Sequence, residues 1–223
     1  MKPTLTTEET LDDRSNGEYC RRMNPAPDIA GTDVRQKILA SGRRAMGGKG
    51  FSAVGLNEVL TAAGVPKGSF YHYFGSKEAF GEALLQDYFD EYLAEMDQIF
   101  ASAGHNKARQ LEHYFAVWME SQSFEDCQGK CLAVKLGAEV ADLSAGMRTA
   151  LRSGTAGIIE RLTRAIEGGQ ADGSLASNGD AAALAQSLYQ LWLGASIMVK
   201  IVRGPQPFDN AQLATRQILQ PSR

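Results

Sequence analysis

The stretch that most constrains the fold is a short helix pattern between two turn signals, at residues 65–74 (VPKGSFYHYF). Proline already has the helical φ and has no N–H to satisfy, so Pro66 predicts the first position of a helix. Gly64 before it predicts a turn with positive φ. Gly75 and Ser76 after it predict a stop followed by a new N-cap. The chain is therefore expected to make a sharp turn, a very short helix and a second turn.

The aromatic side chains of this short helix cannot all be buried together. Phe70 and Phe74 lie four residues apart, share one face and are expected in a core. Aromatic and histidine side chains occupy all five positions 70–74, however, and a period of 3.6 residues turns some of them outward. The outward face is small, polar and basic, which suits phosphate oxygens and base edges. Its members are Lys67, Gly68, Tyr71 and His72.

Two further helix patterns precede the short helix. The first is expected to start at an N-cap, Thr32, and to end at Gly47 and Gly48. The second is expected over residues 54–63, with Ser52 near its start available to a phosphate. Two helices, a glycine turn and a short helix form a helix-turn-helix that reads a major groove.

The charge distribution supports this interpretation. The chain of 223 residues has a net charge of −3, but residues 31–80 carry seven basic and three acidic side chains. That segment is therefore at +4 and the remainder at −7. A basic segment attached to an acidic one is typical of a nucleic-acid-binding module joined to a part that does not touch nucleic acid.

Residues 35–80 resemble the helix-turn-helix of TetR-family transcriptional repressors. The resemblance rests on GVPKGSFYHYF at 64–74 and on SKEAF at 76–80, which includes a lysine directly after the short helix. It implies a homodimer that binds operator DNA, with contacts from Ser52, Lys67, Gly68, Ser69, Tyr71, His72 and Lys77. Two copies would meet two half-sites in successive major grooves, about 34–36 Å apart.

The rest of the chain predicts about six more helices, so the fold class is all-α with about nine helices. A long helix begins after Ser76 and has an apolar side chain at every fourth position from Phe80 to Phe100. Later patterns predict a short helix at 130–140, a helix stopped by Gly168 and Gly169, and a helix at 181–202 that is apolar nearly all round. A helix of this kind is expected to be buried on every side, and it and the helix after it are expected to meet their copies in a partner subunit. The expected divisions are a disordered tail (1–30), a helix-turn-helix domain (31–78) and a regulatory and dimerisation domain (79–223).

Two side chains of the C-terminal segment carry unusual chemistry. Cys131 is expected in the first turn of a short helix, where the helix N-terminus and Lys130 favour the reactive thiolate. The alternative is a small buried side chain, because free cysteine is commonly buried. Lys200 lies in a strongly apolar helix, where a desolvated amine becomes a better nucleophile. The alternative is an amine that reaches solvent near the helix end.

A resemblance in the C-terminal segment extends the family likeness. Residues 129–148 and 188–200 resemble those of an electrophile-responsive repressor of the TetR family, in which Cys131 and Lys200 match a reactive cysteine and lysine. The implied function is a repressor that small reactive electrophiles or oxidants release from DNA. Two questions are left open: whether Cys20 or Cys127 takes part, and whether Lys200 bonds covalently to Cys131.

Two other functions remain as alternatives. In the first, a non-covalent apolar ligand enters a pocket formed by aromatic side chains at Phe115, Trp118, Tyr189 and Trp192. In the second, Cys131 is the nucleophile of a thiol enzyme, for which His113 is the one candidate base. No enzyme activity, cofactor or metal site is expected, because no phosphate loop or repeated metal-ligand spacing occurs. Without a signal sequence or an apolar run of about 18 residues, the expected location is the cytoplasm, with no membrane partner.

Overall fold

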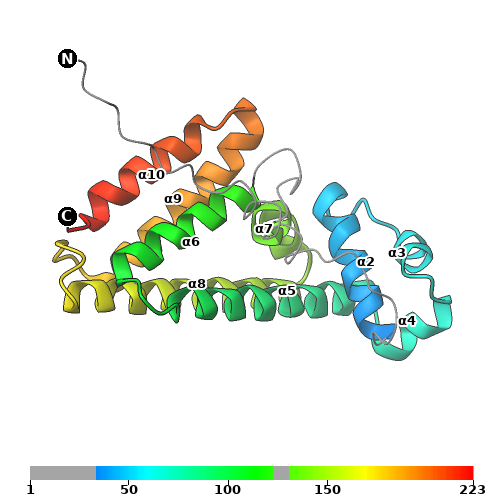
Figure 1. Cartoon of the computed structure of the whole chain (residues 1–223). Coiled ribbons are helices and arrows are strands. Elements are labelled where there is room, and N and C mark those ends of the chain that lie inside the picture. Colours follow the sequence, from blue (N-terminus) through cyan, green and yellow to red (C-terminus); the bar gives the residue numbers. More distant parts are fainter. Residues whose placement is uncertain (1–33, 123–130, 223) are drawn as a thin grey trace, which may run out of the picture.

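The computed structural model in Figure 1 describes residues 34–122 and 131–222. The predicted disordered tail, the N-cap at Thr32, Cys20 and Cys127 all lie outside the described residues. All nine regular elements of the described ranges are helices, which confirms the all-α prediction. They are α2 (Val34–Lys49), α3 (Leu56–Ala63), α4 (Lys67–Tyr73), α5 (Lys77–Phe100), α6 (Lys107–Ser121), α7 (Leu132–Leu143), α8 (Ala145–Ala171), α9 (Ala181–Val202) and α10 (Gln206–Leu219).

Helices α2, α3 and α4 form the helix-turn-helix domain at one end of the molecule (Figure 1). Gly64 takes φ +67 at the end of α3, as its sequence predicts, because the left-handed conformation suits glycine. Two boundaries differ from the prediction. Pro66 is the N-cap of α4 rather than its first residue. Helix α2 continues through Gly47 and Gly48 and stops at Gly50, where φ is +94.

The C-terminal domain is built on α5 and α8, which lie side by side along its length (Figure 1). Ser76 caps α5 by accepting a hydrogen bond from the Ala79 N–H, as predicted. The prediction that Gly168 and Gly169 end a helix is wrong, since α8 runs on to Ala171. A Cβ at Gly169 would come within 2.7 Å of the Leu175 side chain, so close packing explains the glycine there.

Helix α9 is apolar around its circumference but is not buried on every side. Trp192 has no exposed surface, whereas Ile197, Met198, Ile201 and Val202 are 44–66% exposed. The expectation of burial all round is therefore wrong within one chain. Among the described helices, α9 is long and apolar enough to cross a membrane by length and composition, with 39% of that window buried. In this structure α9 packs against α8 and α10 within the C-terminal domain.

Candidate functional site

Helix α4 presents one face to the core and the other to solvent. Phe70 and Phe74 are buried at 0% and 3% exposure, as the spacing predicts. On the opposite side Tyr71 is 55% exposed, and Lys67, Gly68 and His72 are exposed as well. Ser69 is partly buried. Nothing lies within 4 Å of where a Cβ would stand on Gly68, so a large ligand can approach the backbone there.

Tyr73 belongs to the same exposed face although it was not selected from the sequence. It is 37% exposed, and its ring lies edge-on to His72 with centroids 4.8 Å apart. The run of aromatic residues at 70–74 could have indicated its exposure, because a 3.6-residue period places Tyr73 at the border between the buried and the exposed face.

The other two residues predicted to contact DNA have partners within the chain. The Lys77 ammonium lies over the Phe51 ring, 4.7 Å from its centroid. The Ser52 N–H donates to the Glu139 carboxylate at 2.7 Å, and the Phe51 N–H donates to the same carboxylate at 3.0 Å. Ser52 is therefore held toward α7, and its contact with a phosphate stays a prediction.

A cluster of tyrosines surrounds Cys131, which is the N-cap of α7 rather than a residue of its first turn. Cys131 is half-buried, and the Tyr88 hydroxyl of α5 donates a hydrogen bond to its sulfur at 3.5 Å. The hydroxyls of Tyr92 and Tyr114 lie 3.0 Å apart and pair with each other. Burial and these neighbouring groups raise the pKa of Tyr92 well above its usual value, so this phenol keeps its proton.

Helix α9 brings Tyr189 and Lys200 to the same cluster. Burial lowers the pKa of Lys200, the Cys131 thiol acts in the opposite direction, and Lys135 adds to the lowering. Burial raises the pKa of Tyr189, and the proximity of the Cys131 sulfur raises it further. Cys131, at the start of α7, and Lys200, on α9, are therefore near enough to interact electrostatically. We refer to Cys131, Tyr88, Tyr92, Tyr189 and Lys200 as the Cys131 cluster.

The four aromatic residues predicted to line a ligand pocket pack directly on one another. Phe115 and Trp192 stack at 4.7 Å between centroids, and Trp118 lies edge-on to Tyr189 at 5.7 Å. Both indole N–H groups are paired, that of Trp118 with Ser196 and that of Trp192 with Thr215, each at 2.9 Å. A ligand would have to separate these rings, so the pocket stays a prediction.

Two contacts connect the Cys131 cluster to the helix-turn-helix domain. The Arg43 guanidinium of α2 lies 5.8 Å from the centroid of the Tyr88 ring. It also binds Asp87 at 2.7 Å and pairs with Glu91, both on α5. Separately, Glu139 of α7 accepts the two N–H groups of the turn after α2. Asp87 and Glu91 lie on α5, which also provides Tyr88 and Tyr92 of the Cys131 cluster. Glu139 lies on α7, whose N-cap is Cys131.

Sequence reasoning missed Tyr88, Arg43 and Glu139 as members of the site. Tyr88 fell within the apolar stripe of α5 and was assigned to the core, where its ring does lie. Arg43 and Glu139 carried no pattern signal, because their partners are 44 to 88 residues away in the chain. In the described part of the chain, no group of three or more His, Cys, Asp or Glu side chains could hold a metal ion.

Comparisons with known proteins agree with this architecture. Residues 38–84 match the family model of bacterial regulatory proteins of the tetR family, and residues 108–215 match the tetracyclin repressor-like C-terminal domain. The chain is 39% identical over 187 residues to the HTH-type transcriptional repressor NemR of Escherichia coli, covering 84% of this chain and 94% of NemR. It is 33% identical to the repressor DhaR of Mycobacterium sp., covering 87% of this chain and 96% of DhaR.

The solved structures give the same result in three dimensions. The crystal structure of the reduced form of E. coli NemR superposes with a TM-score of 0.80 at 40% identity, covering 84% of this chain and 97% of that one. A regulatory protein TetR from Rhodobacter sphaeroides superposes with a TM-score of 0.74 at 30% identity, covering 82% of this chain and 97% of that one.

Proposed function

Because the chain belongs to the TetR family of bacterial regulatory proteins, we propose that it is a dimeric transcriptional repressor switched by Cys131. In this proposal a small reactive electrophile or oxidant modifies the Cys131 sulfur, and the modified dimer leaves its operator. The observation that carries the proposal is the half-buried thiol hydrogen-bonded to Tyr88, on the helix that leads from the helix-turn-helix domain. The likeness to the repressor NemR supports it.

The exposed face of α4 is the proposed contact with base edges. Tyr71 and His72 would reach the major groove, while Lys67 and Lys77 would bind phosphates on either side. Gly68 and Ser69 would let the backbone approach the duplex closely. The domain boundary proposed from the sequence lies between residues 78 and 79. It assigns this face of α4 to the helix-turn-helix domain and the Cys131 cluster to the regulatory and dimerisation domain.

The exposed apolar face of α9, with Leu213 of α10, is the proposed contact between two subunits. Ile197, Met198 and Ile201 are 44–66% exposed, and Leu213 is 58% exposed. Apolar side chains grouped in this way on one face favour a protein partner, and a second copy would cover them symmetrically. A soluble dimer of this kind acts in the cytoplasm, where its DNA is.

The proposed chemistry needs only the thiolate, Lys200 and the incoming reagent. With an alkylating agent such as N-ethylmaleimide, the sulfur forms a bond to one carbon of the C=C bond, the π bond breaks, and the proton from the thiol is delivered to the other carbon. With hypochlorite, the sulfur takes chlorine and hydroxide leaves. The Lys200 amine then forms an S–N bond as chloride leaves and the amine loses a proton. The lowered pKa of Lys200 increases the fraction of neutral amine available for this step.

The proposed switch runs through the two contacts that leave the Cys131 cluster. A group added to Cys131 displaces the Tyr88 hydroxyl, and the Tyr88 ring supports Arg43 of α2. It also displaces the start of α7, the helix that holds Glu139 against the turn after α2. Either movement changes the separation of the two α4 helices in a dimer, so that they no longer fit two successive grooves.

The test is fluorescence anisotropy on labelled DNA from upstream of the protein's own gene. The reduced protein is measured with and without stoichiometric N-ethylmaleimide. The variants are Cys131→Ser and, as a matched control, the double variant Cys20→Ser/Cys127→Ser. We expect N-ethylmaleimide to release the wild type and the control but not Cys131→Ser. Release of Cys131→Ser would contradict the switch at Cys131, and no binding by any reduced form would contradict the repressor itself.

A further inference from the structure

The Tyr189 hydroxyl is a buried donor without a hydrogen-bond partner among the residues that the structure describes. The residue is 4% exposed, and no donor or acceptor of residues 34–122 and 131–222 pairs with its oxygen. Buried hydroxyl groups in proteins are nearly always paired, so such a group requires an explanation. The ring itself is held firmly, edge-on against Trp118 at 5.7 Å.

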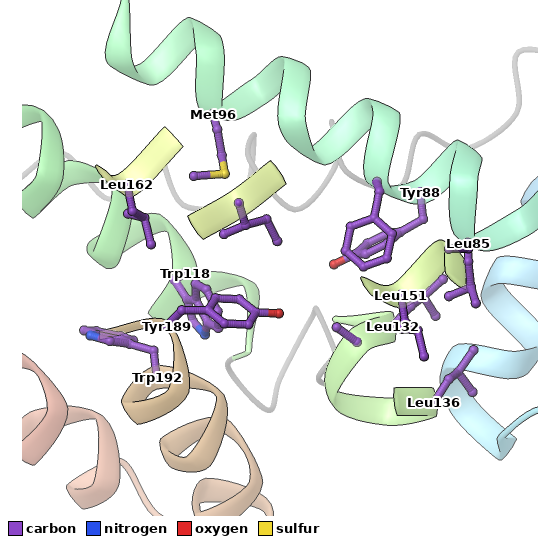
Figure 2. Packing of buried hydrophobic residues seen from close by; sticks show 14 of the residues in the cluster. Leu85, Tyr88, Met96, Trp118, Leu132, Leu136, Leu151, Leu162, Tyr189 and Trp192 are labelled. Atoms are coloured by element: carbon purple, nitrogen blue, oxygen red, sulfur yellow. The ribbon is translucent and has the colours of Figure 1, made fainter. Parts of the chain in front are cut away.

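This hydroxyl lies near enough to the reactive sulfur for the two groups to interact electrostatically. Residue Tyr189 belongs to α9, which packs against α7, the helix that Cys131 caps. In Figure 2 the hydroxyl ends of Tyr189 and Tyr88 point toward each other from α9 and α5. The Tyr88 hydroxyl in turn donates to the Cys131 sulfur.

The other hydroxyls near Cys131 already have partners. Tyr88 donates to the sulfur at 3.5 Å, and Tyr92 pairs with Tyr114 at 3.0 Å. Burial raises the pKa of Tyr189, so its proton stays on the oxygen at neutral pH. The cluster therefore holds a fixed phenol that can donate one hydrogen bond to a molecule that reaches the sulfur.

We propose that Tyr189 determines which electrophiles react at Cys131, by donating a hydrogen bond to the carbonyl oxygen of the incoming molecule. The inference rests on the proposed function, because it assumes that Cys131 is the reacting group. The preferred class is a carbonyl compound whose C=C bond is conjugated to that oxygen. The donor is placed before the reaction, so it stabilises the charge that develops on the oxygen.

The addition of the Cys131 thiol to such a molecule requires no oxidant. The sulfur attacks the β-carbon, the S–C bond forms, and the C=C electron pair moves onto the carbonyl oxygen as an enolate. The Tyr189 hydroxyl stabilises this oxygen while keeping its own proton. The proton lost by the thiol, carried by the Lys200 amine or by water, is returned to the α-carbon. The product is a thioether with the carbonyl restored.

The experiment compares two alkylating agents on the Cys20→Ser/Cys127→Ser background, which leaves Cys131 as the one thiol. N-ethylmaleimide has the conjugated carbonyl, whereas ethyl iodide has no oxygen. The second-order rate constant of adduct formation at Cys131 is measured by mass spectrometry for each. For Tyr189→Phe we expect a loss of about tenfold with N-ethylmaleimide, the effect of one hydrogen bond to a developing charge. With ethyl iodide we expect the rate constant to change by less than about twofold.

Tyr88→Phe is the matched comparison, because it deletes the hydroxyl that binds the sulfur rather than the incoming molecule. It is expected to change both rate constants by the same factor. Tyr189→Met, which also lacks the hydroxyl, serves as a second variant and should give the same selective loss. Equal changes with both reagents, or no change, in the Tyr189 variants would overturn the inference. If the unsubstituted Cys131 forms no adduct at all, the proposed function fails instead.

Discussion

At the scale of single residues, the site depends on which buried hydroxyl groups are paired. Thr215 accepts the Trp192 N–H at 2.9 Å and donates to the Ala211 carbonyl at 2.7 Å. The Tyr189 hydroxyl is buried to a similar extent and has no hydrogen-bond partner in the described part of the chain. Removing the hydroxyl should therefore change the free energy of unfolding in opposite directions at Tyr189 and Thr215. Only the loss of the Thr215 hydroxyl leaves a buried group, the Trp192 N–H, without its hydrogen-bond partner.

Tyr189→Phe is expected to stabilise the reduced protein by about 1 kcal/mol, since it removes an unpaired buried hydroxyl. Thr215→Val, the matched control, is expected to destabilise it by about 1–3 kcal/mol, because the Trp192 N–H loses its acceptor. Urea denaturation followed by circular dichroism measures both. Destabilisation by Tyr189→Phe would mean that its hydroxyl has a partner in solution.

At the scale of elements, α7 connects the thiol to the helix-turn-helix domain. Its N-cap is Cys131, and two turns further on Glu139 holds the backbone of Phe51 and Ser52. Burial opposes the charge on Glu139, but hydrogen bonds from Ser52 and Phe51 outweigh it and lower the pKa of this carboxyl. A carboxylate that accepts two N–H groups is a directional contact that a small rotation of α7 can break.

Glu139→Gln is expected to lower the free energy of unfolding by about 1 kcal/mol at pH 7, since a charged acceptor is lost. Because the folded pKa lies below the unfolded value, the carboxylate stabilises the protein above about pH 4.3. That stabilisation is lost as the pH falls through the folded pKa. The difference between variant and wild type should therefore shrink toward pH 3, as followed by urea denaturation at several pH values.

The control for this prediction is Glu58→Gln, which removes an exposed carboxylate paired with Lys49. Exposed ion pairs contribute little, so about 0–1 kcal/mol is expected, and less in high salt. A pH dependence unchanged by Glu139→Gln would show that the α7 contact does not hold in solution. In that case coupling through Tyr88 and Arg43 would carry the switch by itself.

At the scale of the whole molecule, the apolar face of α9 is exposed to solvent in a single chain. Ile201 is 66% exposed and Leu213 of α10 is 58% exposed, although both lie in otherwise well-packed helices. A second copy would bury them and place two α4 helices on one duplex. Affinity for an operator with two half-sites then depends on the dimer, because the second contact becomes intramolecular.

Ile201→Glu is expected to give a monomer in sedimentation velocity and to weaken operator binding by about 10²-fold or more, since the linkage between half-sites is lost. Leu143→Glu is the matched control. Leu143 is 53% exposed at the end of α7, outside the proposed face, so that variant should remain a dimer. A dimeric Ile201→Glu protein would place the subunit contact elsewhere.

The helices and the helix-turn-helix could be predicted from the amino-acid sequence, because these elements depend on neighbours within a few residues. The spacing of Phe70 and Phe74, the glycine turn at Gly64 and the cap at Ser76 all act locally. The resemblance in residues 35–80 identified the family for the same reason, since the short helix and its turns are continuous in the chain. Cys131 and Lys200 could be selected as unusual residues from the sequence pattern, whereas a bond between them was implied only by the family resemblance.

How those residues are grouped follows from the folded arrangement of the helices. Tyr88 on α5 and Tyr189 and Lys200 on α9 all interact with Cys131 although they are far apart in the sequence, and the periodicity assigns Tyr88 only to the core. The continuation of α8 through Gly168 and Gly169 likewise depends on Lys107 and Leu175 packing against it. A helix pattern states which face is apolar, whereas the packed fold decides which atoms that face touches and which hydroxyl stays unpaired.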